Sequence, residues 1–402
     1  MGFSSWGRYL GLAIGPGKHE HSWDAALPKY LQRACSWGNH HLGLQFSAAV
    51  YNTYVATVLS HIWQLETLPL TFKDFEHKAF RKLASGPGNW ILPNDLHFVK
   101  ELYGQARSFV DATAASLAAR IRVYTWEASA DGGLRAKHRA AHLLTTLRNS
   151  DLFERKARWR RWYEQSAVVN LSESINDFAT ATGTTVRRVL QELRTRHTTG
   201  GTTHLKAVKK EFQKAIYSRL MMARQPIGED RYRQRLARWQ LPGVPLRVAR
   251  RALRQLKDLN RFVPPRISAA VLSTAWNRWC TDRRFQRPQE RGCRLGCGAI
   301  EDSIEHYSRC RFVHSFASTF LCLDFPRARG LELFAFAFDS WSAEKDKVKA
   351  SILIYAVYRV TETIRHDEGA FPEEVVVHML QQACREAVKG HSGAMRILDN
   401  PR

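Results

Sequence analysis

The chain has 402 residues, a length typical of two to three domains of about 150 residues each. Its residues are 44% hydrophobic and include 20 Phe and 12 Trp, which excludes disorder of the whole chain. Lysine and arginine number 61 against 37 aspartate and glutamate residues, so the net charge of +24 favours polyanionic partners such as nucleic acids. The odd count of seven cysteines excludes the evenly paired pattern of a secreted disulfide framework.

The spacing of apolar residues predicts a mainly α fold. Residues 8–14 predict one short strand, which the turn at 15–17 ends. Helices are predicted over 23–37, over 44–65 and after Thr71, which can cap the third helix. After a loop at 85–89, we expect one long helical segment over 95–123.

The turn at Asp131–Gly133 is the first predicted domain boundary. Helical patterns continue to residue 402, with interruptions at 198–203, 226–228, 242–245 and 264–265. There is no secretory signal pattern and no run of about 18 apolar residues, so we expect no membrane span and no membrane partner. We expect the chain to be intracellular, with the nucleus as one of its locations.

Four potential metal ligands lie close together in the sequence. They are Cys293, Cys297, His306 and Cys310. Their spacing, C-x3-C-x8-H-x3-C, supplies two close pairs of sulfur and nitrogen ligands and predicts one structural Zn²⁺ site. Gly296 and Gly298 let the backbone turn around Cys297, and His306 and Cys310 would share one face of a helix that starts near 303. The alternative is three buried cysteines beside a surface histidine.

Two other features of the cysteine and histidine content bear on this site. His314, four residues beyond Cys310, is the nearest substitute ligand. The four remaining cysteines have no partner at metal-binding spacing, and we expect them in the core. They are Cys35, Cys280, Cys322 and Cys384.

The positive charge is concentrated in the middle of the chain. Residues 155–290 contain 30 Lys or Arg and 10 Asp or Glu. Cations neutralise phosphates and aromatic rings stack on unpaired bases, so this region predicts binding of RNA or DNA. The alternative is that the tryptophans are core residues and the arginines form a solvated face. The candidate nucleic-acid-binding residues are Arg155, Lys156, Arg158, Trp159, Arg160, Arg161, Trp162, Arg231, Arg233, Arg235, Arg247, Arg250, Arg251 and Arg254.

Separate parts of the chain resemble one family, the non-LTR retrotransposon reverse transcriptases. Tyr9-Leu10-Gly11 is similar to the Tyr-Leu-Gly strand that follows the catalytic aspartates of this RNA-directed DNA polymerase, and Gly43–Val55 resembles its thumb. The cysteine cluster is similar to the zinc-binding segment downstream of the polymerase. The resemblance implies a primer-grip-like role for Tyr9, Leu10 and Gly11.

The same resemblance implies a domain order. It gives a palm or primer-grip β-hairpin remnant at 1–20, thumb-like helices at 21–130, a basic helical linker at 131–290, a zinc knuckle at 291–325 and a C-terminal helical region at 326–402. No two aspartates are adjacent anywhere in the chain, whereas the family polymerase needs paired aspartates to hold two metal ions. The chain begins after the place where that pair would lie. We therefore expect a mobile-element protein that holds RNA or DNA template-primer but does not polymerise by itself.

Several functional alternatives stay open at this point. The missing polymerase part of the same element is one expected partner. The chain could instead be an independent zinc-knuckle adaptor that binds nucleic acid, or a protein-interaction scaffold in which Trp and Arg form the interface. Asp339, Glu344 and Lys345 approach a nuclease pattern, but they lie in a helix-forming stretch, and no nuclease is predicted.

Overall fold

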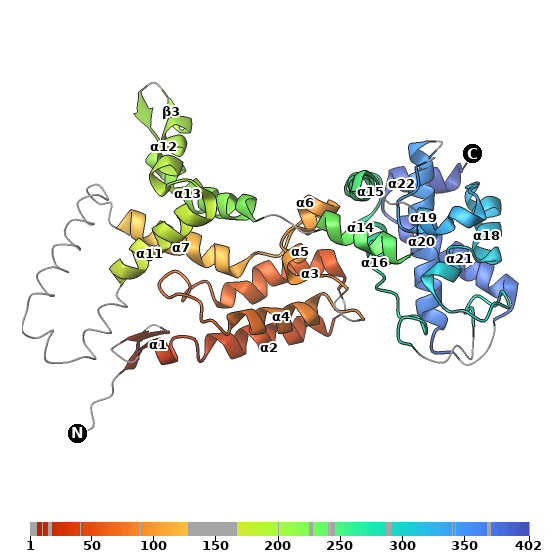
Figure 1. Ribbon diagram of the computed structural model, residues 1–402, viewed down its shortest axis with the longest axis horizontal. Coiled ribbons are helices and arrows are strands. Elements are labelled where there is room, and N and C mark those ends of the chain that lie inside the picture. The colour runs from red at the N-terminus through yellow and green to blue at the C-terminus, as the bar shows by residue number, and fades with distance from the viewer. Residues whose placement is uncertain are drawn as a thin grey trace, which may run out of the picture. The chain divides into compact units, whose positions relative to one another are not determined.

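The described residues are mainly helical, as the sequence predicts, and form two small β-hairpins (Figure 1). It divides into two compact units, residues 1–36, 50–79 and 110–225, and residues 37–49, 80–109 and 226–402. Each unit is described by itself. The computed structural model describes residues 6–9, 11–14, 18–40, 42–87, 90–127, 167–199, 201–224, 228–239, 241, 246–286, 292–339, 341, 343–367 and 371–401.

The first unit begins with a β-hairpin, as expected for residues 1–20, whereas the pattern over 8–14 alone predicted a single strand. Strands β1 (Gly7–Tyr9) and β2 (Leu12–Ile14) pair antiparallel, with Tyr9 opposite Leu12. Gly11 has a φ of 83°, a left-handed conformation that glycine adopts without steric cost, and the chain reverses there. Helix α1 (Lys18–His21) follows.

The helix predicted over 44–65 is regular only at its start. Helix α3 (Leu44–Val50) passes into a π-helical turn, η1 (Tyr51–Val55), and then into a 3-10 turn, η2 (Ala56–Val58). Tyr51, Val55 and Leu59, four residues apart, are all fully buried. These three side chains therefore stay on the buried side of the chain through the π and 3-10 turns. Two longer helices, α2 (Ala26–Gly38) and α4 (Phe72–Leu83), begin close to the predicted positions.

Four helices form the core of the first unit. They are α7 (Ala112–Glu127), α11 (Ala167–Thr182), α12 (Val186–Arg196) and α13 (Leu205–Ala223). The second hairpin, β3 (Thr198–Thr199) with β4 (Thr202–Thr203), joins α12 to α13 at a predicted interruption. Helix α13 contributes Val208, Phe212, Ile216 and Leu220 to the shared core. Each such side chain contributes about 1.5–3 kcal/mol when it is fully buried.

The long helix predicted over 95–123 is broken in the structure. Helices α5 (Pro93–Leu96) and α6 (Val99–Tyr103) precede Gly104, which ends α6 with a φ of 69°. A Cβ atom at Gly104 would lie 2.4 Å from the carbonyl oxygen of Lys257. The position therefore requires glycine for two reasons, the left-handed backbone and the close approach of another helix.

The second unit is built around α20 (Glu344–Ile364). Helices α16, α18, α19, α21 and α22 all pack against it. Most of its residues from Val348 to Ile364 are buried, as expected for a helix enclosed on several faces. From residue 226 onward, the other described helices of this unit are α14 (Gly228–Arg238), α15 (Leu246–Leu259), α16 (Pro265–Ala275), α17 (Ile304–Tyr307), α18 (Arg311–Leu321), η3 (Arg327–Arg329), α19 (Gly330–Phe334), α21 (Glu373–Val388) and α22 (Ser392–Asp399).

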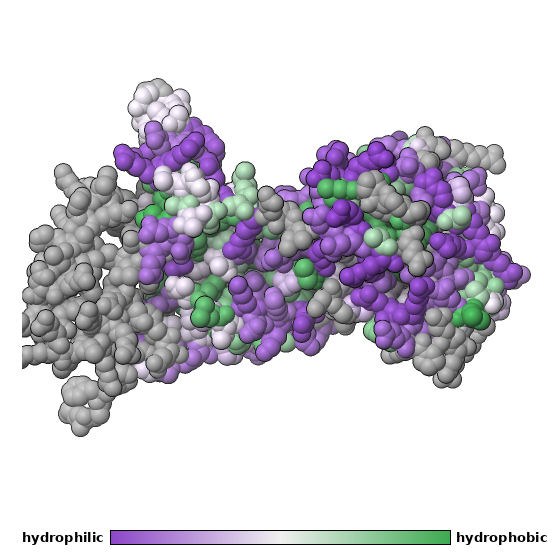
Figure 2. Space-filling model, viewed as in Figure 1, coloured by the Kyte–Doolittle hydropathy of each residue, from purple (hydrophilic) through white to green (hydrophobic). Residues whose placement is uncertain are grey.

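Hydrophilic residues predominate among the coloured residues of Figure 2, and hydrophobic residues form small separate patches there. Among the described residues, no helix is both long enough and apolar enough to cross a membrane. The start of α16 at Pro265 matches a predicted interruption. The predicted turn at 131–133 and the interruption at 242–245 lie outside the described residues.

Candidate functional site

The four predicted metal ligands come together in the second unit. The ligand atoms of Cys293, Cys297, His306 and Cys310 all lie within 4.8 Å of one another. The Cys293 and Cys310 Sγ atoms are 4.0 Å apart, and Cys297 Sγ is 3.2 Å from His306 Nε2. Tetrahedral zinc, with bonds of about 2.3 Å to sulfur and about 2.0 Å to nitrogen, would need separations of roughly 3.8 and 3.5 Å. The donor set and its spacing therefore fit a metal ion such as zinc.

A tight glycine-rich turn positions the first two ligands. The N–H of Cys293 donates to the Ala299 carbonyl at 2.8 Å, and the N–H of Gly296 donates to the Cys293 carbonyl at 3.0 Å. Gly296 and Gly298 have φ values of 76° and 84°. These left-handed residues turn the backbone around Cys297, which confirms the role predicted for the two glycines.

Two short helical starts position the other two ligands. The Ser303 hydroxyl accepts a hydrogen bond from the His306 N–H at 2.9 Å and so caps α17. Helix α17 ends at Tyr307, and Cys310 is the N-cap of α18. The prediction that His306 and Cys310 lie on one helix was therefore wrong. The chain turns between them, which allows the Cys310 sulfur to accept hydrogen bonds from the N–H groups of Phe312 and Val313.

The electrostatics of the cluster favour a thiolate at Cys310. A hydrogen bond from Cys293, another from His306 and the two N–H groups of α18 together lower the pKa of Cys310 to about 4, despite its burial. The same Cys293–Cys310 hydrogen bond, followed by burial, raises the pKa of Cys293. Burial also raises the pKa of Cys297. Because thiolates are the metal-binding form of cysteine, a cation bound among these sulfurs would displace the remaining thiol protons.

A buried polar network holds the ligand segment against the core. The Tyr307 hydroxyl donates to Asp302 Oδ1 at 2.6 Å, and Arg294 pairs with Asp282 at 2.7 Å and with Asp302 at 3.8 Å. The ring of Trp279, itself 1% exposed, packs 5.8 Å from the ring of Tyr307. Outer contacts of this kind fix the orientation of metal ligands. The four residues together supply the four ligands that a tetrahedral ion takes.

The other cysteines and His314 lie apart from this cluster. His314 Nε2 is 2.8 Å from the Phe325 carbonyl oxygen, which makes it a packing residue of α18 rather than a substitute ligand. Cys384 is buried, as predicted for a core cysteine. Cys35, Cys280 and Cys322 are only half-buried, so the core prediction was wrong for them.

Helix α15 places its candidate arginines on the outside. Arg247, Arg250 and Arg254 are exposed, and Lys257 continues the same row. The opposite face of α15 is buried and consists of Ala249, Ala252, Leu253, Leu256 and Leu259. Arg251 differs from the others because it is half-buried and lies 4.0 Å from Asp339.

Helix α14 uses its candidate arginines differently. Arg231 pairs with the fully buried Asp95. Arg233 is exposed and lies 3.7 Å from Asp230. Arg235 is half-buried, with its guanidinium 4.9 Å from the centre of the Trp239 ring. The neighbouring aromatic rings of Tyr232 and Trp239 are buried and belong to the core.

The remaining candidates are less informative. Tyr9 is 64% exposed on β1, and Gly11 lies in the hairpin turn. The other candidates lie outside the described residues: Leu10, Arg155, Lys156, Arg158, Trp159, Arg160, Arg161 and Trp162.

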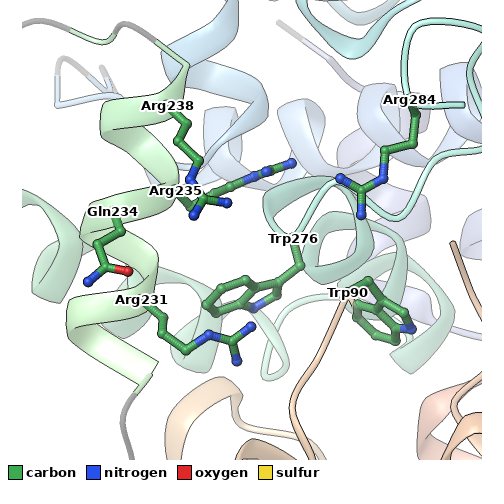
Figure 3. Close-up of a pocket in the computed structure, with 7 residues that line it drawn as sticks. All are labelled: Trp90, Arg231, Gln234, Arg235, Arg238, Trp276 and Arg284. Atoms are coloured by element: carbon green, nitrogen blue, oxygen red, sulfur yellow. The ribbon is translucent and has the colours of Figure 1, made fainter. Parts of the chain in front are cut away.

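A pocket in the second unit was not predicted from the sequence. It is lined by Trp90, Arg231, Arg235, Arg238, Trp276 and Arg284 (Figure 3). Arg231, Arg235 and Arg238 follow one another along α14 at spacings of four and three residues, which places them on one helical face. This spacing was the part of the pocket that could have been predicted from the sequence. The tryptophans and Arg284 come from other segments of the chain.

In the comparisons with known proteins, no family model, no curated protein and no solved structure matches this chain.

Proposed function

We propose that this chain is a nucleic-acid-binding, C-terminal part of a reverse transcriptase of the non-LTR retrotransposon type. It would hold RNA or DNA through a basic helical surface, with a structural zinc ion that stabilises the neighbouring segment. The support from the sequence is the Tyr9-Leu10-Gly11 strand, the thumb-like segment and the Cys-Cys-His-Cys spacing, in that order along the chain. The absence of adjacent aspartates in the sequence argues against polymerase chemistry by this chain alone.

The observation that carries the proposal is the basic face of α15. Arg247, Arg250, Arg254 and Lys257 follow one another at spacings of three, four and three residues, and all four are exposed. On a helix that turns by about 100° per residue, this spacing places the four side chains within an arc of about 80° on one side. The buried leucines and alanines of the opposite side anchor the helix in the second unit. The cations are therefore fixed in a row that can follow a phosphate backbone.

Most of this row is free to take phosphate. Among the described residues, Arg247, Arg254 and Lys257 form no ion pair. Arg250 pairs with Glu229 at 2.7 Å, but both groups are about half exposed. Exposed pairs of this kind are screened by solvent and contribute little, so a phosphate can replace the glutamate at little cost.

The zinc ion would contribute by holding its segment together. Cys293, Cys297, His306 and Cys310 would bind it, and a bound ion would cross-link the glycine turn, α17 and the start of α18. These residues supply the chemistry of a structural site, in which folding of the segment and binding of the ion are coupled.

A salt titration tests this proposal. Four phosphate contacts predict a slope of roughly 3 in log K against log salt, which is a loss of about 100-fold in affinity between 50 and 200 mM salt. The variant R247A/R254A/K257A should bind a single-stranded RNA and a duplex DNA more weakly and with a shallower slope. R359A/R385A/R396A is the matched control, because it removes three exposed cations of the same unit from other helices.

The outcomes separate the candidate functions. Weaker binding by the α15 variant with unchanged binding by the control supports the proposal. Equal losses in both variants would mean that only the net charge matters. A flat salt response of the wild-type chain, or no binding at 50 mM salt, would overturn the proposal and leave the protein-interaction scaffold as the better function.

A further inference from the structure

The arginine pocket of the second unit is assembled from distant segments. Helix α14 supplies Arg231, Arg235 and Arg238, Trp276 follows the end of α16, and Arg284 lies in the turn after it. Figure 3 shows Arg235 and Arg238 of α14 on one side and Arg284 on the other, above the Trp276 ring, with Arg231 below that ring. The pocket volume is about 160 Å³. That is room for several water molecules at roughly 30 Å³ each.

The walls of the pocket are held by contacts that do not involve a ligand. Arg231 pairs with Asp95 and lies with its guanidinium 5.0 Å from the centre of the Trp276 ring. The Trp90 indole N–H donates to the Ala84 carbonyl at 2.8 Å. These side chains are therefore positioned before anything binds, which lowers the entropic cost of binding.

The pocket carries an excess of positive charge. Among the described residues, two acids are shown to act on its arginines: Asp95 pairs with Arg231, and the charge of Glu305 acts on Arg235. The four lining arginines and these two carboxylates together leave an excess of two positive charges within the part of the chain that the structure describes. Burial, followed by the repulsion from Arg284 and Arg238, lowers the pKa of Arg235 to about 10. The site is therefore electrostatically unfavourable for Arg235 unless an anion enters.

The hydrogen-bonding capacity of the pocket is also incompletely used. Within the described residues, the buried Nε of Arg235 has no hydrogen-bond partner. With its amide oriented to suit its neighbours, Asn277 accepts from Arg235 and, at 3.2 Å, from Arg284 Nη1. The amide is neutral, so it satisfies donors without reducing the charge. An oxyanion would do both, and guanidinium groups match the oxygen geometry of phosphate.

We propose that this pocket binds a phosphomonoester, and that its source is the phosphorylated end of a nucleic-acid strand. A phosphomonoester carries a charge of about −1.5 to −2 at pH 7, which balances the excess of two, whereas an internal phosphodiester carries one charge. The choice of a strand end as the source rests on the proposed function, while the phosphomonoester itself rests on the pocket alone.

Binding of matched oligonucleotides tests the proposal. A labelled single-stranded RNA with a 5′-phosphate, its 3′-phosphate isomer and the same strand with two hydroxyl ends would be titrated against the full chain. Charge-assisted hydrogen bonds predict at least about 10-fold tighter binding of one phosphorylated form. R235Q and R238Q should abolish this preference. R261Q is the matched control, because Arg261 is an exposed arginine of the same unit that neither lines the pocket nor belongs to the candidate nucleic-acid-binding residues.

A thermal melt distinguishes loss of the ligand site from loss of the fold. Because Arg235 is a half-buried charge with no carboxylate pair among the described residues, R235Q should keep or raise the melting temperature while it loses the phosphate preference. Inorganic phosphate and a nucleoside monophosphate, tested by the shift in melting temperature, separate a strand end from a free phosphomonoester as the source.

Each result decides between the proposals. Equal affinities of the wild-type chain for the three strands would overturn the pocket proposal and leave general nucleic-acid binding intact. A preference that persists in R235Q and R238Q would also overturn it. If no strand binds but free phosphate stabilises the wild-type chain and not R235Q, the pocket stands and the proposed function fails. If neither strands nor phosphate bind, both fail.

Discussion

Glu76 gives a pH dependence that can be worked out from its surroundings in the first unit. It is 8% exposed on α4. Burial raises its pKa from 4.5 to about 7. A hydrogen bond from the Ala112 N–H, the charges of Arg224 and Lys73 and a hydrogen bond from Tyr51 lower the pKa and offset burial only in part.

The sign of the effect follows from the proton balance. The folded state keeps the Glu76 proton up to about pH 7, whereas the unfolded chain releases it above pH 4.5. The stability that the protonated carboxyl provides is therefore fully present below pH 4.5 and is lost as the pH rises through 7. A shift from 4.5 to about 7 corresponds to about 3 kcal/mol of unfolding free energy lost across this window.

The substitution Glu76→Gln tests this reasoning, because glutamine has the shape of the protonated acid and cannot ionise. Urea unfolding from pH 4.5 to 8 should give equal stabilities at the acid end and a variant that is more stable by about 2–3 kcal/mol at pH 8. Amide hydrogen exchange in α7 provides a local measurement. Glu173→Gln, an exposed glutamate of α11, is the control. Parallel pH profiles for wild type and Glu76→Gln would refute the argument.

Three further outcomes are expected. Elemental analysis should find one zinc per chain, and Cys297→Ser should lose the ion and increase hydrogen exchange in α17 and α18; a zinc content near zero under reducing conditions would contradict this. Arg231→Gln leaves the fully buried Asp95 without its partner and should cost about 3–5 kcal/mol in urea unfolding. Adding Asp95→Asn to Arg231→Gln should recover most of that loss. If Arg231→Gln alone is as stable as the double variant, the Arg231–Asp95 ion pair does not stabilise the fold as argued. The purified chain should not extend a primed RNA template with Mg²⁺, since it contains no adjacent aspartates, and template-dependent extension would contradict that expectation.

The metal cluster could be predicted because its determinants are local. All four ligands fall between residues 293 and 310, and the left-handed glycines on either side of Cys297 act on the same short turn. What the spacing could not show was the break between α17 and α18. A separation of four residues fits one helical face, but it fits a turn that ends in an N-cap equally well, and only the backbone distinguishes them.

Features that depend on tertiary contacts were not predictable in the same way. The helical periodicity over 95–123 continues through Gly104. The helix breaks at Gly104, where the carbonyl oxygen of Lys257, far away in the sequence, approaches too closely for any residue with a Cβ atom. The pocket likewise brings Trp90, Trp276 and Arg284 together with α14. None of these residues forms a pattern with the others along the chain, so composition and spacing carry no signal of their proximity.

The regular spacing along α13 has a geometric consequence for the first unit. Val208, Phe212, Ile216 and Leu220 follow one another every four residues, and each step advances the side-chain direction by about 40° on a helix with about 100° per residue. Over the three steps, the apolar stripe sweeps through roughly 120°. A narrow apolar face could pack against only one neighbouring helix. Because the apolar stripe turns around α13, this helix contacts α7, α11 and α12 together. Helix α13 is therefore the central helix of this bundle. A shift of its register by one turn would move its apolar side chains away from more than one neighbouring helix at once.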